Sequence, residues 1–113
     1  MGPLKTRRAV LTGAAAAAAA SSAGIAYAAN PVTHVVRITS FVFVPERIEV
    51  QVGDTIRWVN DDLAPHTATA DAFGWDTGEI GNSQAAEIVV TQDMETTYFC
   101  VFHPHMTGQI VIG

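Results

Sequence analysis

The chain from residue 34 onward consists of short segments rich in β-branched and aromatic residues, separated by residues that favour turns. Arg47–Val52 and Thr55–Val59 alternate polar and apolar side chains, as a strand with one buried face does. Gly53 and Asp54 between them form a turn signal, and no window shows sustained helical periodicity. The segments that we expect to be strands are 34–39, 41–45, 47–52, 55–59, 66–70, 85–91, 96–100 and 108–112. This pattern predicts an all-β protein, an antiparallel sandwich of about seven or eight strands.

Two segments carry more specific expectations. Phe41 and Phe43 are two residues apart, which in a strand puts both rings on one face. The segment 71–83 is rich in glycine and aspartate, so we expect it to be irregular, with at most one helical turn.

The N-terminal region has the parts of a signal peptide. Met1–Arg8 is basic, Ala9–Ile25 is apolar and rich in alanine, and Ala26-Tyr27-Ala28 has the small-x-small form of a signal peptidase site. The apolar stretch is short and only weakly hydrophobic, which argues against a membrane-spanning anchor. We therefore predict a cleaved signal peptide over residues 1–28 and a protein exported to the periplasm.

Thr6-Arg7-Arg8 resembles a twin-arginine export signal, and an ordinary secretory signal with two arginines is the alternative. Residues 29–113 suit one small domain with one core. In this part three arginines face eleven acidic residues, which gives a net charge of −8. Such an acidic domain is a poor candidate for binding nucleic acid. The charge suits steering toward a basic partner, or it serves only solubility.

The strongest chemical signal is a set of three side chains near the C-terminus. Cys100, His103 and Met106 follow one another at three-residue steps, and Cys100 is the one cysteine of the chain. A thiolate, an imidazole and a thioether are ligand types of a blue copper site, which needs one more imidazole. His66, which follows Pro65, can supply it from another strand. We expect Cys100 at the end of a strand, and His103 and Met106 on the loop after it.

Other readings of these residues remain open at this point. A lone cysteine cannot form a disulfide within the chain, so it is either a metal ligand or a buried, inert residue. A structural zinc site fits less well, because zinc prefers several Cys or His ligands and seldom takes methionine. A Cys–His nucleophile would leave Met106 without a role.

Four motifs are spread through residues 29–113: Phe41-x-Phe43-x-Pro45, Val52–Asn60, Pro65-His66 and Cys100-x-x-His103-Pro104-x-Met106-x-Gly108. In these motifs the chain resembles the cupredoxins, in their amicyanin and plastocyanin-like branch. The resemblance implies a Greek-key β-sandwich with one type 1 copper ion near one end. It implies His66, Cys100, His103 and Met106 as the copper ligands, and a structural role for Asn60.

The chain departs from this family pattern at two positions. Thr67 stands where many relatives carry an asparagine that ties the two ligand loops together, and Phe102 stands where short-loop relatives often carry proline. Proline has no N–H, whereas Phe102 has one, so we expect the Phe102 amide to donate to the Cys100 sulfur. His105 lies between two candidate ligands and is expected to point outward.

The function implied is that of a periplasmic blue copper protein that shuttles single electrons and is not an enzyme. It would act as a monomer, with redox proteins such as a dehydrogenase or a c-type cytochrome as partners and no stable membrane insertion. An apolar patch around His103 would let a partner approach; its members would be Leu63, Ala64, Pro65, Phe102 and Pro104. A copper-binding or delivery protein is the main alternative, and an enzyme that uses the copper or the thiol is a third.

Overall fold

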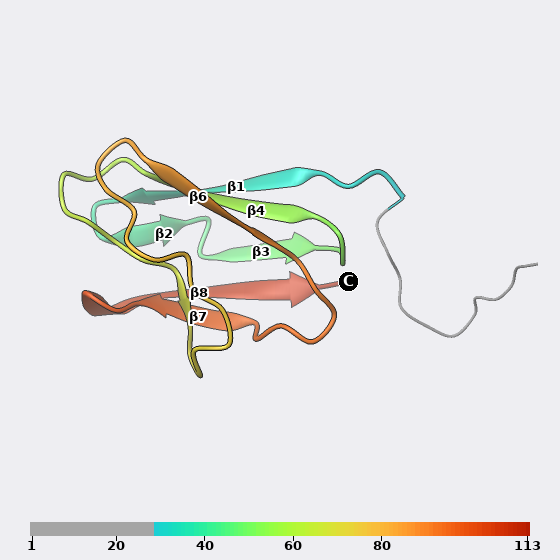
Figure 1. Ribbon diagram of the computed structural model, residues 1–113. Helices are drawn as coiled ribbons and strands as arrows, with labels where there is room; N and C mark the ends of the chain where they lie inside the picture. The colour runs from blue at the N-terminus through green and yellow to red at the C-terminus, as the bar shows by residue number, and fades with distance from the viewer. Residues whose placement is uncertain (1–28) are drawn as a thin grey trace, which may run out of the picture.

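The computed structural model describes residues 29–113, and the predicted signal peptide lies outside this part. Two four-stranded sheets form a sandwich (Figure 1), in the orders β2-β1-β4-β6 and β3-β8-β7-β5. The all-β sandwich is confirmed. None of the described residues belongs to a helix long and apolar enough to cross a membrane. The strands are β1 (Thr33–Thr39), β2 (Val42–Val44), β3 (Arg47–Val50), β4 (Thr55–Asn60), β5 (Thr69–Ala70), β6 (Ala85–Val89), β7 (Thr97–Cys100) and β8 (His103–Ile112).

Two strand pairs are parallel, so the predicted sandwich is not antiparallel throughout. β1 runs parallel to β4, with Val36 opposite Trp58, and β3 runs parallel to β8, with Ile48 opposite Ile110. The reason lies between β2 and β3, where the chain leaves the first sheet for the second. Pro45 stands at this crossing and has no N–H to continue a strand ladder. Because β3 joins the second sheet, β4 returns beside β1 in the same direction.

The core between the sheets is built around aromatic rings. Trp58 of β4 stacks on Trp75, with ring centroids 5.6 Å apart, and meets Tyr98 of β7 edge-on at 5.4 Å. Trp58 and Tyr98 are almost fully buried, so these rings join the two sheets. Gly108 of β8 makes room for this contact, because a Cβ at that position would overlap the Tyr98 ring.

The segment 71–83 is irregular, as predicted, and the described structure shows no helical turn in it. It folds back along the preceding residues through two isolated bridges, His66 with Ile80 and Thr69 with Asp76. The segment therefore braces the stretch that carries the predicted histidine ligand.

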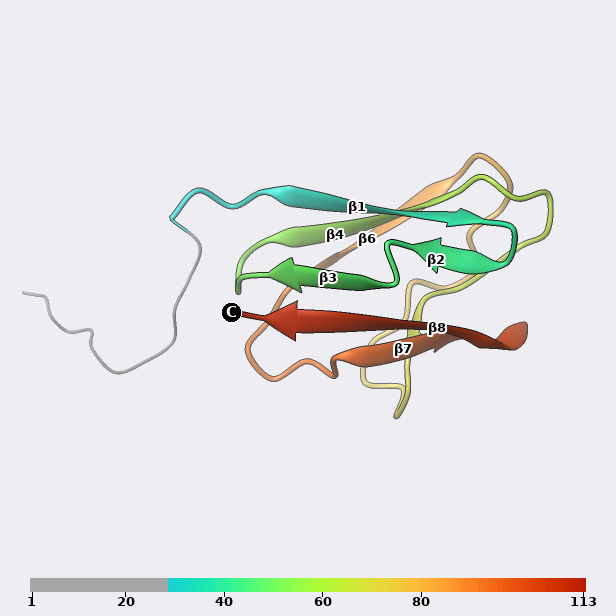
Figure 2. The same cartoon turned by 180° about the vertical axis from the view of Figure 1, so that it is seen from behind.

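One end of the sandwich gathers the candidate ligands and two neighbouring turns. The β1–β2 turn and the β7–β8 turn both lie at the end away from the C-terminus (Figures 1 and 2). Cys100 ends β7 and His103 begins β8. His66 follows β4 at the same end, where it is bridged to Ile80.

Candidate metal centre

Three of the four predicted ligands meet in one cluster. Nδ1 of His66 lies 3.7 Å from Sγ of Cys100, and Nδ1 of His103 lies 3.6 Å from the same sulfur. The three donor atoms all lie within 4.8 Å of one another. Donors bound to one ion at roughly 2.0–2.3 Å, in a trigonal arrangement, would be separated by about 3.7 Å. The cluster therefore has the dimensions of a site for one metal ion.

Met106, the fourth predicted ligand, is buried on β8 with 2% of its surface exposed. It lines a small hollow together with Phe41 and His105. Phe41 in turn contacts the rings of His66 and His103. Met106 thus lines the same hollow as the residue that contacts both imidazoles, and its side chain is shielded from solvent.

Cys100 and His103 face each other across a tight hairpin. The prediction that His103 and Met106 lie on a loop was therefore wrong, because both belong to β8. β8 begins at His103, and the turn between β7 and β8 consists of Val101 and Phe102 alone. The strand register places His103 directly opposite Cys100, next to a β-bulge between Phe99 and Cys100. A hairpin forms because residues on either side of so short a turn are forced into cross-strand pairing. The pairing brings the imidazole to the sulfur within a single hairpin.

His66 is held at both its backbone and its ring. Its backbone N–H donates to Ile80 O at 3.1 Å, and its carbonyl accepts from Ile80 N at 2.7 Å. Nε2 of the ring lies 2.9 Å from Oδ2 of Asp62. A ring that donates through Nε2 to a carboxylate presents an unprotonated Nδ1, which here points at Cys100 Sγ.

The contact of Asp62 with His66 was not predicted from the sequence. The Asp62 carboxylate also accepts from the Ser40 and Phe41 amides, at 2.8 and 3.0 Å. Burial acts to raise the pKa of Asp62, but the hydrogen bonds from Phe41, Ser40 and His66 outweigh it, so this pKa is lowered. Asp62 therefore remains a carboxylate that binds the β1–β2 turn and His66 together. The four-residue spacing from Asp62 to His66 was the one sequence signal available.

Phe41 lies outside the strand in which it was predicted. It lies in the β1–β2 turn with a φ of 62°, outside β2, so the prediction that it shares a strand face with Phe43 was wrong. Its ring meets His66 at 5.2 Å and His103 at 4.7 Å between centroids, edge-on in both cases. Phe41 thus covers both imidazoles from the side of the β1–β2 turn.

Thr67 ties the two ligand segments together. Its hydroxyl accepts a hydrogen bond from Val101 N at 3.0 Å, and its own amide donates to Cys100 Sγ at 3.4 Å. The amide hydrogen bond to this sulfur within residues 29–113 comes from Thr67, so the prediction that Phe102 donates it was wrong. The strand register explains the difference, because the Phe102 amide belongs to the turn that pairs Cys100 with His103.

Asn60 has the structural role that was predicted. Its side-chain amide donates to the carbonyls of Ala64 and Ile80, at 2.9 Å each, and its Oδ1 accepts from Asp62 N at 2.8 Å. These bonds hold the loop between β4 and His66 in one conformation, which also orients Asp62 toward the His66 ring.

The residues predicted to form an apolar patch around His103 are at least partly exposed, and Phe102 lies beside the His103 ring. His66 and Cys100 are fully buried, whereas His103 is partly exposed. Leu63 is 90% exposed and Phe102 is 47% exposed. Pro65 and Pro104 are also exposed, Ala64 is half-buried, and His105 points outward as expected. His103 is therefore the one ligand candidate of the three-residue cluster that reaches the surface.

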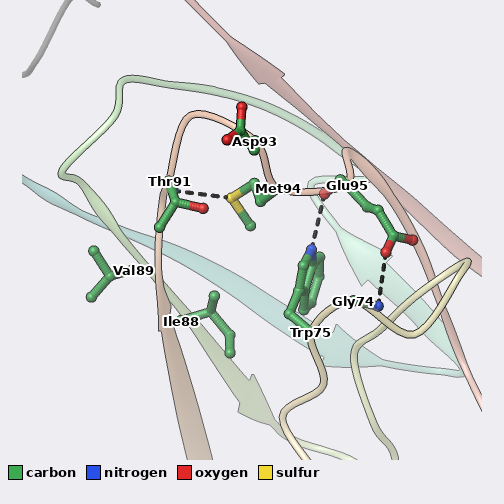
Figure 3. Close-up of a pocket in the computed structure, with 8 residues that line it drawn as sticks. All are labelled: Gly74, Trp75, Ile88, Val89, Thr91, Asp93, Met94 and Glu95. Carbon is green, nitrogen blue, oxygen red and sulfur yellow. Dashed lines mark hydrogen bonds between the residues drawn. The ribbon is translucent and has the colours of Figure 1, made fainter.

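A separate hollow of about 300 Å³ is lined by residues of the segments 74–75 and 88–95 (Figure 3). Its polar groups are engaged locally, since Trp75 Nε1 donates to Glu95 O at 3.0 Å and Gly74 N donates to the Glu95 carboxylate at 2.7 Å. The hollow contains none of the candidate ligands. Across residues 29–113, the cluster of His66, Cys100 and His103 is the one group of His, Cys, Asp and Glu side chains arranged to hold a metal ion.

Comparisons with known proteins agree with this geometry. Residues 9–112 match the model of the cupredoxin-like domain. The chain belongs to the cupredoxin-like domain family. It is similar to amicyanin from Paracoccus versutus, 29% identical over 86 residues, and to amicyanin from Paracoccus denitrificans, 29% identical over 88 residues. Both matches cover 69% of this chain and 63% of the relative, so the chain spans less than two thirds of the length of these amicyanins.

Among solved structures, the chain is similar to the copper(I) form of a methionine-to-alanine mutant of amicyanin. The TM-score is 0.64 at 27% identity, over 72% of this chain and 82% of the other. The fold of this cupredoxin is therefore the amicyanin fold.

The donor set fits copper better than the alternatives. A type 1 copper site uses one thiolate, two imidazoles and a weak axial thioether, and this end of the sandwich offers all four. A structural zinc site would take a fourth Cys or His, and residues 29–113 place none in the cluster. The cofactor is thus one type 1 copper ion.

Proposed function

We propose that this cupredoxin is a blue copper electron carrier, with His66, Cys100, His103 and Met106 as ligands of one type 1 copper ion. The observation that carries the proposal is the convergence of the two Nδ1 atoms on Cys100 Sγ, at 3.6 and 3.7 Å. Copper bound there supplies reversible one-electron chemistry. The chain provides the binding site and performs no catalytic turnover of its own.

The proposed ligands differ in how deeply they are buried, and this difference suggests different roles. Cys100, His66 and Met106 exclude water from the inner side of the site, because each is at most 2% exposed. His103 is partly exposed between the apolar side chains of Phe41 and Phe102. A redox partner docked on this apolar face would meet the His103 ring first. We therefore assign His103 as the route for electrons between the site and the partner.

The rigidity of the site favours a carrier over the alternative, a copper-delivery protein. His66 is fixed through its backbone and through Asp62, and Thr67 joins the two ligand segments. A site held by the fold changes little between the two oxidation states, which speeds electron transfer. A delivery protein has to release its metal readily, so fast copper loss to a chelator without reversible redox cycling would favour that function.

The cellular setting is part of the proposal. Residues 1–28 are removed, and a monomeric mature protein exchanges electrons in the periplasm with a redox protein such as a dehydrogenase or a c-type cytochrome. The net charge of −8 on residues 29–113 supports a basic partner. The arginines of this part offer little free positive charge, because Arg37, Arg47 and Arg57 each pair with a carboxylate. The rate of reaction with a basic cytochrome should then fall as salt is added. A rate indifferent to salt would remove electrostatic steering from the proposal.

The visible and EPR spectra of residues 29–113, after addition of one equivalent of Cu(II), test the copper site. An intense blue band with a narrow copper hyperfine splitting would establish the thiolate ligand. A pale solution with an ordinary Cu(II) spectrum would mean that Cys100 does not bind copper as proposed.

A further inference from the structure

A chain of hydroxyl groups connects the Cys100 hairpin with an exposed carboxylate. Val101 N–H donates to Thr67 Oγ1 at 3.0 Å, and Thr67 Oγ1 lies 2.9 Å from Thr69 Oγ1. Thr69 Oγ1 donates to Asp76 Oδ1 at 2.8 Å. Thr67 and Thr69 are buried, at 3% and 1% exposed, whereas Asp76 reaches the surface. The chain of hydrogen bonds therefore runs from the exposed Asp76 to Val101, the residue after Cys100.

We call Thr67, Thr69 and Asp76 the relay. The Asp76 carboxylate sets the direction of every hydrogen bond in it. An ionised carboxylate only accepts hydrogen bonds, so the single Thr69 proton is used on Asp76. Thr69 then accepts from Thr67, and the Thr67 oxygen keeps its lone pairs for the Val101 amide. Without Asp76 the direction of the Thr67–Thr69 hydrogen bond would no longer be fixed, and without the Thr69 hydroxyl the Thr67 proton would lose its acceptor in this arrangement.

The position of Asp76 is itself fixed. Its Oδ1 also accepts from Gly78 N at 3.0 Å, and its backbone forms a bridge with Thr69. Gly78 has a φ of +74°, a backbone conformation that favours glycine, so the turn that presents this amide is specified by the sequence. The outer end of the relay is thus anchored independently of the copper site.

We propose that Thr69 and Asp76 are positioning residues for the copper thiolate. They orient the Thr67 hydroxyl toward Val101, and this bond keeps the Thr67 amide on Cys100 Sγ, 3.4 Å away. The proposal rests on the copper site proposed above. An amide that donates to a thiolate stabilises its negative charge, which weakens the donation to Cu(II) and raises the reduction potential. Breaking the relay should therefore lower the potential.

A merely structural role for the relay would leave the bonds at the thiolate unchanged. Hydrogen exchange of the Thr67 and Val101 amides in the metal-free protein distinguishes the two cases. We expect Thr69→Val to speed exchange of the Val101 amide about tenfold, the size of one hydrogen bond, and Thr69→Ser to leave it near the wild-type rate. Equal exchange rates in the two variants would overturn the proposal. This readout does not depend on copper.

The copper-loaded protein gives the second readout, and it covers the case in which Thr69→Val does not fold. Asp76→Ala and Asp76→Asn remove the same charge from the surface, but the asparagine retains an oxygen that accepts from Thr69. We expect Asp76→Ala to have the lower potential of the two. Glu79→Gln, an exposed acid on the same segment, controls for charge alone. Identical potentials for the two Asp76 variants would overturn the proposal. A wild-type protein without a blue spectrum would instead refute the copper site itself.

Discussion

The carboxylate of Asp62 accepts a hydrogen bond from Nε2 of His66, at 2.9 Å, and the Phe41 ring meets the same imidazole edge-on, with ring centroids 5.2 Å apart. Asp62 also binds the amides of Ser40 and Phe41. One side chain therefore fixes the ring that presents Nδ1 to the metal and the turn that carries the covering aromatic ring. Two parts of the site, distant in the sequence, depend on this single carboxylate.

Replacement of Asp62 by alanine should weaken copper binding. The His66 ring would lose the partner that fixes its orientation and its protonation, and removal of such partners typically costs 10–100-fold in metal affinity. Competition with a chelator of known affinity measures the change. Asp61→Ala is the matched control, because Asp61 binds Arg37 at 2.7 Å and does not contact His66. Equal affinities for the two variants would contradict the role assigned to Asp62.

The parts of the site that were predictable from sequence are local ones. Cys100 and His103 are joined by a two-residue turn, so their approach follows from the chain itself. Polar and apolar alternation predicted β3 and β4, because the sandwich buries one face of each strand. The ligand types then indicated the metal, since few ions accept a thiolate, two imidazoles and a thioether together.

The parts that were not predictable depend on how distant segments pack. The contact of Phe41 with both imidazoles follows from a left-handed turn and from the Asp62 carboxylate twenty-one residues away. The parallel pairing of β1 with β4 follows from the crossing of the chain between sheets at Pro45. Neither relationship leaves a periodic pattern in the sequence, so only the assembled sandwich reveals them.

Removal of the Phe41 ring should destabilise the metal-free protein. Two edge-on aromatic contacts would be lost, and each is worth about 0.5–1.5 kcal/mol, so the free energy of unfolding should fall by roughly 1–3 kcal/mol in Phe41→Ala. Denaturant titration measures it. Phe73→Ala is the control, because Phe73 is more exposed, at 68%, and has one aromatic contact, with Phe99 at 6.0 Å. A loss in Phe41→Ala no greater than that of the control would show that the ring does not stabilise the imidazoles.

A side chain at Gly108 should strain the core below the copper site. The added Cβ of Gly108→Ala would overlap the buried Tyr98 ring, which has little room to move because it also contacts Trp58. Overpacking of this kind costs about 1–3 kcal/mol. Gly113→Ala is the control, because its Cβ would lie in ordinary contact, 3.7 Å from Val50 O. Urea unfolding of both variants tests the difference, and equal midpoints would mean that the Tyr98 ring moves aside freely.

The pH dependence of stability should reveal a buried carboxylate at the other end of the sandwich. Asp54 binds His34 Nε2 at 2.8 Å and the amides of Val32 and Gln51 at 3.1 and 3.0 Å. The hydrogen bond from His34, together with these amides, outweighs the effect of burial and holds the pKa of Asp54 below its ordinary value of 3.8.

A lowered folded-state pKa fixes the sign of this effect. The stabilisation is fully present above the pKa of the unfolded state and is lost as the pH falls through the lower folded-state value. Urea unfolding at neutral pH and in the acid range should therefore show a steeper acid loss for the wild type than for Asp54→Asn. Asp93→Asn, at an exposed residue, is the control and should follow the wild type. If Asp54→Asn lost as much stability in acid as the wild type does, a different carboxylate would have to cause the acid sensitivity.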